Sequence, residues 1–271
     1  MRRYIARIRN LEQENEDLRK NQRPQGCFEN ELDIECDFEE NGPEYTCSAK
    51  NLIVTKENST INSASGKHAR NKRSDDVSTI TITDQNVKYI PTGLYKTFPL
   101  LKRLVIENSK LSKLSHPAFE NLGHITILDI RGNKIIHIEP KFFDPVDELV
   151  ELYLPRNEIK SLPPKLFEPL YKLKIIDLSD NEITSVVATL IPLKNSVESF
   201  AISNNNLKKI DPRLSKRIGK ANMIDFSSNE CINMKFNFGD EEDKKKVLFG
   251  IIAMNCFEHD DEEFCQKNVL I

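Results

Sequence analysis

Apolar residues in the middle of the chain recur in a fixed frame. The frame is LxxLxLxxNxL, where L stands for an apolar residue, x for a variable residue and N for a polar residue. It begins seven times at a constant period, without insertion or deletion, at Val77, Leu101, Ile125, Leu149, Leu173, Val197 and Ala221. A unit repeated at such a period cannot bury its apolar face alone, so the pattern predicts a solenoid of stacked units.

Each copy of the frame predicts a short strand followed by an inward turn. Positions 4 and 6 are apolar and alternate with variable positions 3, 5 and 7, which is typical of a strand with one buried side. Position 9 is polar throughout: Gln85, Ser109, Asn133, Asn157, Asn181, Asn205 and Asn229. An asparagine side chain both donates and accepts hydrogen bonds, so stacked asparagines can bond backbone groups that a buried turn leaves unpaired. The first two copies lack asparagine, and we expect their turns to be looser.

These columns resemble the leucine-rich repeat family, and the segment IDLSDNEITSV at 176–186 is a close copy of the family consensus. The resemblance covers residues 77–231 as seven repeats. It implies an α/β repeat solenoid, a horseshoe with short parallel strands on its concave face. It also implies a non-enzymatic module that binds a protein ligand through that face.

The region before the repeats, residues 24–55, predicts an N-terminal β-hairpin cap. Apolar and acidic residues alternate along LDIECDFE at 32–39, and Asn41-Gly42 is a strong turn signal. With that turn, Cys36 faces Cys47 across the hairpin. The register favours a Cys36–Cys47 disulfide, and two buried free thiols are the alternative.

The region after the repeats, residues 232–271, predicts a C-terminal helical cap and an acidic tail. The segment EEDKKKVLFGIIAMNC ends at Cys256 and has an apolar half that suits the open end of a solenoid. It resembles the cysteine-stapled cap of extracellular leucine-rich repeat proteins, in a reduced form, and that resemblance implies a Cys231–Cys256 disulfide. Caps and repeats together are similar to those of insect extracellular leucine-rich repeat proteins, a class often assigned to adhesion or immune recognition.

The segment between the hairpin and the repeats, residues 56–76, is polar and rich in serine and asparagine. Its composition predicts a loop. Asn58-Ser59-Thr60 matches the acceptor sequence for N-glycosylation. We therefore expect Asn58 to carry a glycan if the chain is secreted.

Residues 1–23 predict a short coiled-coil helix. Apolar or special residues recur at alternating spacings of three and four, and Asn15 falls at an a position, where it favours a parallel dimer in register. Such a homodimer would place two copies of Cys27 close enough for an interchain disulfide. A frayed helical tail on a monomer is the alternative. The segment YIARIRNLEQENEDLR also resembles the start of the rod of lamins and other intermediate-filament proteins.

Composition removes several classes of function. The 39 Lys and Arg residues and 42 Asp and Glu residues leave a net charge of −3, without the basic field that nucleic-acid binding uses. The longest apolar run, VLFGIIAM at 247–254, is far shorter than the roughly 18 residues of a membrane span. The five histidines have no metal-ligand spacing. We expect no catalytic residue, metal or cofactor, no nucleic-acid partner and no membrane span.

The candidate binding residues are the mixed aromatic, aliphatic and charged side chains of the central repeats. Tyrosine and arginine are enriched at the energetic centres of protein interfaces. A generic polar surface is the alternative reading of these positions. The predicted set is Arg103, Ile127, Asp129, Arg131, Glu151, Tyr153, Arg156, Ile175 and Asp177.

Two interpretations of the compartment stay open. The paired cysteines favour an extracellular module for recognition or adhesion. The sequence as it stands shows no apolar leader after MRRY. That observation and the lamin-like start favour a cytoplasmic or nuclear scaffold, dimerised by its coiled coil.

Overall fold

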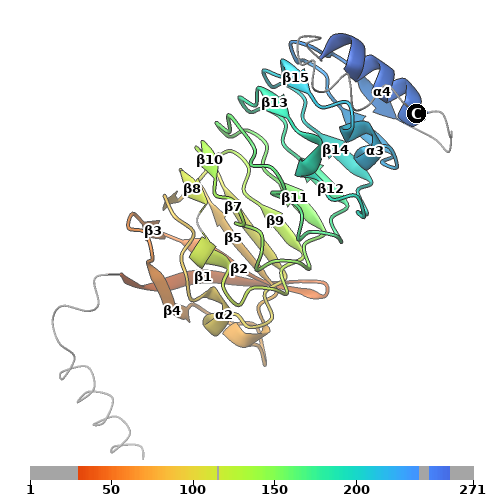
Figure 1. Cartoon of the computed structure of the whole chain (residues 1–271). Coiled ribbons are helices and arrows are strands. Elements are labelled where there is room, and N and C mark those ends of the chain that lie inside the picture. The colour runs from red at the N-terminus through yellow and green to blue at the C-terminus, as the bar shows by residue number, and fades with distance from the viewer. Residues whose placement is uncertain (1–29, 115, 238–243, 257–271) are drawn as a thin grey trace, which may run out of the picture. The chain divides into compact units, whose positions relative to one another are not determined.

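The computed structural model describes residues 30–114, 116–237 and 244–256, which fold as a stack of similar turns (Figure 1). The predicted coiled coil with Asn15, together with Cys27 and the acidic tail, lies outside the described residues. No helix in the described ranges is long and apolar enough to cross a membrane.

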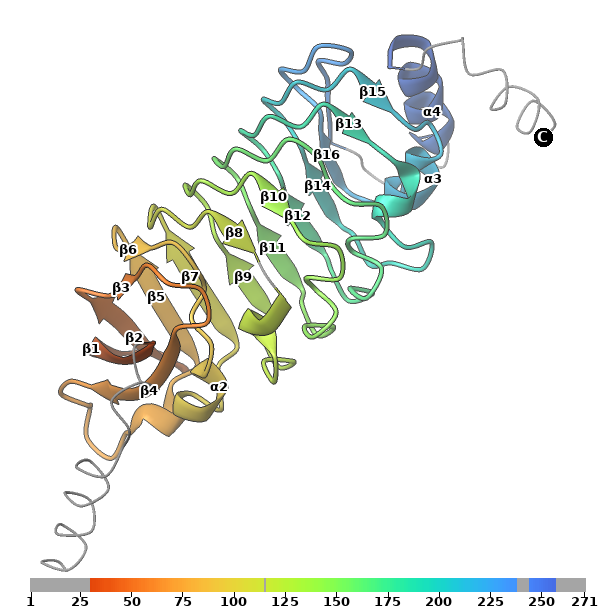
Figure 2. The same cartoon turned by 60° about the vertical axis from the view of Figure 1, so that its left-hand side comes forward.

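Seven parallel strands, one from each copy of the frame, form the body of the main sheet across the described repeats. Neighbouring strands pair with a shift of one repeat, as in Ile127 opposite Glu151 and Glu151 opposite Ile175. Figure 2 shows these strands lying side by side along one surface of the stack. They are β5 (Thr79–Thr83), β7 (Arg103–Glu107), β9 (Ile127–Asp129), β11 (Glu151–Tyr153), β12 (Ile175–Asp177), β14 (Ser199–Ala201) and β16 (Met223–Asp225).

The core lies between this sheet and the segments that return to it. Positions 4 and 6 of every copy point inward and are buried, and position 19 adds aromatic rings, among them Phe119, Phe143 and Phe167. Phe142 lies between two of them, with ring centroids 5.0 Å from Phe119 and 4.9 Å from Phe143. The side chains that the alternation predicts to be buried are therefore the ones that form the core.

The described residues of the return segments form only short elements. Each is too short to fold independently, so the return side is held by packing and by contacts between repeats. Three two-stranded pairs of parallel strands lie beyond the inward turns: β3 (Ile53–Val54) with β6 (Asn86–Val87), β8 (Lys113–Leu114) with β10 (His137–Ile138), and β13 (Ser185–Val186) with β15 (Lys209–Ile210). The short helices are η1 (Ser74–Asp76), α2 (Leu94–Thr97), η2 (His116–Phe119), η3 (Ala188–Leu190) and α3 (Leu214–Ile218).

The asparagine column ties each turn to the one before it. Asn157 Oδ1 accepts from the Ile135 N–H at 3.2 Å, and its Nδ2 donates to the Ile130 carbonyl at 3.1 Å. The same side chain donates to the Leu154 carbonyl of its own repeat at 3.0 Å. Equivalent bonds recur at Asn133, Asn181, Asn205 and Asn229. One side chain thus satisfies backbone groups of two repeats that are closed to water.

The ladder extends into the first two copies, which lack asparagine. Gln85 Oε1 accepts from the Leu52 N–H at 2.9 Å, and Ser109 Oγ donates to the Ile82 carbonyl at 3.2 Å. The expectation of looser turns is therefore wrong with respect to these hydrogen bonds, because longer and shorter polar side chains reach equivalent backbone groups.

The N-terminal hairpin consists of β1 (Glu31–Asn41) and β2 (Glu44–Lys50), and its register differs from the expected one by two residues. Cys36 pairs with Ala49 and Phe38 with Cys47, because the turn is Gly42-Pro43 instead of Asn41-Gly42. Proline has no N–H for the strand ladder, so it is better placed in the turn. Gly42 has φ +62, which suits the first central position of a type II′ turn.

The hairpin is joined to the repeat sheet and contains a disulfide. Strand β2 runs parallel to β5, with Cys47 opposite Ile80. The Cys36–Cys47 disulfide is present despite the shifted register, with a Cα–Cα distance of 5.2 Å. A further strand, β4 (Thr60–Ser65), lies beside β1 within residues 56–76, where composition predicted a loop. Ile61 of this strand is fully buried. Its burial was not predicted, because its neighbours in the sequence are polar.

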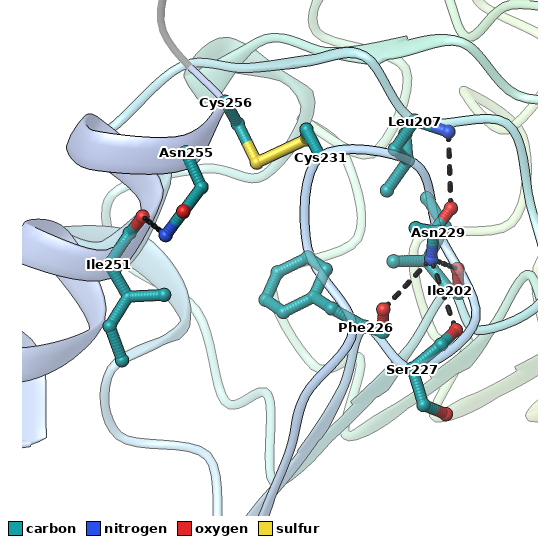
Figure 3. Close-up of a disulfide and its surroundings, with 9 residues drawn as sticks. All are labelled: Ile202, Leu207, Phe226, Ser227, Asn229, Cys231, Ile251, Asn255 and Cys256. Atoms are coloured by element: carbon teal, nitrogen blue, oxygen red, sulfur yellow. Dashed lines mark hydrogen bonds between the residues drawn. A yellow bond between two sulfur atoms is a disulfide. The ribbon is translucent and has the colours of Figure 1, made fainter.

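Within the described residues after the repeats, one strand and one helix follow. Strand β17 (Lys235–Asn237), which was not predicted, runs antiparallel to β16. Helix α4 (Lys244–Asn255) buries Leu248 and Ile252. The Cys231–Cys256 disulfide joins the end of this helix to the last repeat (Figure 3). The backbone N–H of Ile210 also donates to the Cys256 carbonyl at 3.2 Å.

Candidate functional site

The outward side chains of β7, β9, β11 and β12, at positions 3, 5 and 7 of each copy, form a surface that we call the strand face. In-register pairing fixes its rows, so that Asp129, Tyr153 and Asp177 are aligned across three strands. A second row aligns Ile127, Glu151 and Ile175. Eight of the nine predicted binding residues belong to these positions, and the ninth, Arg156, lies in the turn after β11.

Arg131 and Asp129 form an ion pair at the end of β9, where Asp129 is the last residue of the strand and Arg131 follows it. Arg131 Nε lies 2.8 Å from Asp129 Oδ1 and 3.0 Å from Oδ2, so the guanidinium contacts both carboxylate oxygens. Hydrogen bonding to Asp129 raises the pKa of Arg131, and the charges of Glu107 and Asp177 add to the effect. The Asp129 carboxylate is buried beneath the guanidinium, so it positions Arg131 instead of presenting itself to a partner.

Tyr153 is fixed by contacts on two sides. The Cζ of Arg131 lies 5.5 Å from the centroid of its ring, a cation–π distance. Its hydroxyl donates to Glu151 Oε2 at 3.0 Å. Burial of the ring, followed by the hydrogen bond and charge of Glu151, raises the pKa of Tyr153 to about 12. The phenol is therefore neutral at physiological pH, and its ring is half-buried on the strand face.

Arg156 takes part in the same surface from the turn. It has φ +57, and its exposed side chain reaches back across two repeats to place Nη2 3.3 Å from Glu107 Oε1. Sequence reasoning missed Glu107. The signal that could have found it is its column, because Glu107 occupies position 7, the same position as Arg131.

Apolar side chains complete the strand face. Ile127 and Ile175 are half-buried on either side of Glu151, so hydrocarbon surface adjoins the charged groups. Such a mixture of aromatic, aliphatic and arginine side chains is typical of the energetic centre of a protein interface. Because its polar groups pair mainly with each other, the surface is suited to non-covalent recognition.

Two further predictions concern chemistry outside the strand face. Asn58 is exposed in the turn between β3 and β4, with φ +62. Within the described ranges, no group of three or more His, Cys, Asp or Glu side chains could hold a metal ion. Asn15 and Cys27, the predicted interchain residues, lie outside those ranges.

Comparisons with known proteins agree with the architecture. The family described as "Leucine rich repeat" matches residues 99–159 and 147–195. The crystal structure of the APL1 leucine-rich repeat domain is similar at a TM-score of 0.57 and 18% identity, over 73% of this chain and 53% of that one. The leucine-rich repeat domain of APL1B gives a TM-score of 0.48 and 20% identity, over 56% of this chain and 44% of that one.

The chain therefore spans about half the length of these two solved structures. At such identities the likeness concerns the fold alone. No curated protein sequence matches the chain. The repeat frame and the parallel sheet with its asparagine ladder agree with the family match, so residues 99–195 of the chain are leucine-rich repeats.

Proposed function

We propose that this chain is a non-enzymatic recognition module that binds a protein partner through the strand face. The observation that carries the proposal is the arrangement of Asp129, Arg131 and Tyr153. An aromatic ring and a guanidinium are held by a buried carboxylate and by each other before any partner arrives. Side chains that are already ordered lose little conformational entropy on binding, which favours affinity.

The surroundings of these three residues support the same proposal. Half-buried Ile127 and Ile175 provide apolar area beside Tyr153 that a partner would remove from water. The charged pair of Arg156 and Glu107 lies at the margin, where ion pairs affect specificity and association rate more than affinity. An aromatic and arginine centre with a polar margin is the usual anatomy of such interfaces.

We also propose that the module acts outside the cell. Disulfides persist in oxidising compartments and are rare in the cytosol, and the described residues contain Cys36–Cys47 and Cys231–Cys256. The exposed position of Asn58 in a turn supports its use as a glycosylation site. These features favour extracellular recognition over the intracellular scaffold.

Site-specific photocrosslinking tests the binding surface. A benzoylphenylalanine at Ile127 would place the reactive group on the strand face. The matched control at Ile136 would place it on an exposed isoleucine of the following turn, outside that face. We expect a discrete protein adduct from Ile127 and none from Ile136 when the secreted protein is exposed to its source tissue. Adducts that form equally at both positions would contradict the assignment of the strand face.

A further inference from the structure

Three aspartates occupy position 5 of the frame, namely Asp129, Asp177 and Asp225. Each has the same local geometry, because its Oδ1 accepts the backbone N–H of the residue two positions later. The nitrogen–oxygen distances are 3.4 Å for Arg131, 3.0 Å for Ser179 and 3.0 Å for Ser227. The backbone bond orients the carboxylate and leaves the other oxygen, Oδ2, for a further partner.

Two of these three carboxylates form an ion pair with a positively charged side chain. Asp129 is paired with Arg131, which occupies position 7 of its own repeat. Asp225 has a serine at that position, and its cation comes from β17 instead, with Lys235 Nζ 3.0 Å from Asp225 Oδ2. A position-5 aspartate can therefore be paired in two ways, either with an arginine at position 7 of its own repeat or with a lysine from another strand.

Asp177 has the same geometry without the cation. Ser179 stands where Arg131 stands relative to Asp129, and no lysine or arginine of the described part of the chain forms an ion pair with Asp177. Asp177 is only partly buried, so a group from outside can reach it. Asp177 on β12 pairs in register with Tyr153 on β11. Arg131 contacts the Tyr153 ring from the opposite side, where β9 lies.

We propose that Asp177 receives an arginine side chain of the protein partner, which pairs with the carboxylate beside the Tyr153 ring. The partner's guanidinium would pair with Asp177 on one side of Tyr153, as Arg131 pairs with Asp129 on the other side. Arginine suits this place better than lysine, because its planar, weakly hydrated group both contacts carboxylates in a bidentate manner and stacks on aromatic rings. Glu151, in the row of Ile127 and Ile175, adds negative charge nearby.

This inference rests on the proposed function of the strand face and narrows it to a class of partner. The partner presents an arginine next to apolar side chains, which cover Ile127 and Ile175. The arginine would be a principal determinant of specificity, because an uncharged residue in its place would leave Asp177 without a counter-ion.

A titration with a small probe tests the site without knowledge of the partner. The probe is N-acetyl-arginine amide, and its control is N-acetyl-citrulline amide, which has nearly the same shape without the charge. The backbone amide of Ser179 is the reporter in a nitrogen–proton NMR spectrum, because it donates to Asp177. We expect a saturable shift with arginine and little or none with citrulline.

Three variants make the titration specific. Asp177→Asn keeps the backbone hydrogen-bond acceptor but removes the charge, and should weaken arginine binding up to about fivefold, the effect of one solvent-accessible ion pair. Ser179→Arg should block the probe by filling the site from within. Ser185→Arg is its matched control, because Ser185 is an exposed serine of the same repeat on β13, outside the strand face. The control should bind the probe as the native chain does.

The outcomes separate this inference from the proposed function. Equal shifts with citrulline, unchanged binding in Asp177→Asn, or no shift in the native chain would overturn the role of Asp177. If Ser179→Arg does not fold, as its amide spectrum would show, Asp177→Asn alone decides. A crosslinked partner at Ile127 with no arginine response at Asp177 would leave the strand face as the binding surface and remove only the arginine. An arginine response at Asp177 without any adduct at Ile127 would keep Asp177 as an arginine site but remove the protein partner proposed for the strand face.

Discussion

Arg131 lies over the ring of Tyr153, with its Cζ 5.5 Å from the ring centroid, although the two residues belong to different repeats. The contact exists because the in-register pairing of successive repeats brings position 7 of one copy near position 5 of the next. It links the two repeats on the solvent side of the sheet, whereas the asparagine ladder links them on the inner side.

Replacing Tyr153 with Ala should weaken partner binding by about 1–2 kcal/mol, because the ring is the largest apolar group of the strand face and also orders Arg131. Tyr153→Phe keeps the ring and loses only the hydroxyl bond to Glu151, so its effect should be smaller. The matched control is Tyr171→Ala, which removes an exposed tyrosine with Lys172 over its ring but outside the strand face. Equal affinities for the Tyr153 and Tyr171 variants, measured by calorimetry, would place the interface elsewhere.

Asn157→Ala should lower the free energy of unfolding by about 1–3 kcal/mol, because it leaves the Ile135 N–H without its acceptor in a buried turn. It also removes one of the two side-chain donors to the Ile130 carbonyl, the other being Asn133. Asn206→Ala is the control, since Asn206 is exposed. Urea unfolding of both variants checks the prediction. A loss of the same size in Asn206→Ala would show that asparagine in these turns acts through local conformation instead of the ladder.

The Asp225 carboxylate should stabilise the last repeat only when it is ionised. Burial alone would raise its pKa, but the bonds from Ser227 and Lys235 outweigh burial, so the pKa is lowered from 3.8. A carboxyl whose folded pKa lies below the unfolded value contributes its full stability above the unfolded pKa, and the contribution is lost as pH falls through the folded pKa. The melting temperature of Asp225→Asn should therefore be below that of the native chain at pH 7. The difference should shrink below about pH 4, which is near the unfolded pKa. A constant difference across that range would contradict the assignment.

Both disulfides should be present in secreted protein. Peptide mapping without reductant should link Cys36 to Cys47 and Cys231 to Cys256. Replacing Cys231 and Cys256 together with serine should lower stability by about 3 kcal/mol, as expected for closure of a loop of this size. Free thiols at all four positions in secreted material would contradict the extracellular proposal.

The predicted dimer needs a test on the whole chain. Sedimentation of residues 1–271 should be compared with a chain that starts at Gln25 and lacks the predicted coiled coil with Asn15. We expect the longer chain alone to dimerise, and an interchain bond through Cys27 to appear without reductant. Equal monomeric masses over micromolar concentrations would refute the dimer.

The repeat strands could be predicted from the sequence because each burial position recurs once in every copy of the frame. An error of one residue in any copy would turn its apolar side chains outward, so the register of the frame is strongly constrained. The hairpin had no such repetition. Its register depended on one turn, and the choice between Asn41-Gly42 and Gly42-Pro43 moved every pair by two positions.

The strand face could be predicted only as a set of positions. Which residues share a surface follows from the column of each residue, and the structure brings Ile127, Glu151 and Ile175 together as expected. Which of them pair does not follow, because pairing depends on side-chain conformations across repeats. The burial of Asp129 under Arg131 and the reach of Arg156 to Glu107 are of this kind. Strand β4 was missed because its one buried apolar residue, Ile61, lies among polar ones.

The asparagine ladder also bears on how such a chain can change its length. Each asparagine from Asn133 onward bonds the backbone of its own copy and of the copy before it. Gain or loss of one whole repeat would therefore leave every remaining turn with its partners, whereas an insertion between the strand and the asparagine of one copy would displace that asparagine from the ladder. Evolution could widen or narrow the binding surface in steps of one strand at little cost to folding. Each position-5 aspartate belongs to a single repeat, so Asp177, which forms no ion pair within the described residues, would be gained or lost together with that repeat.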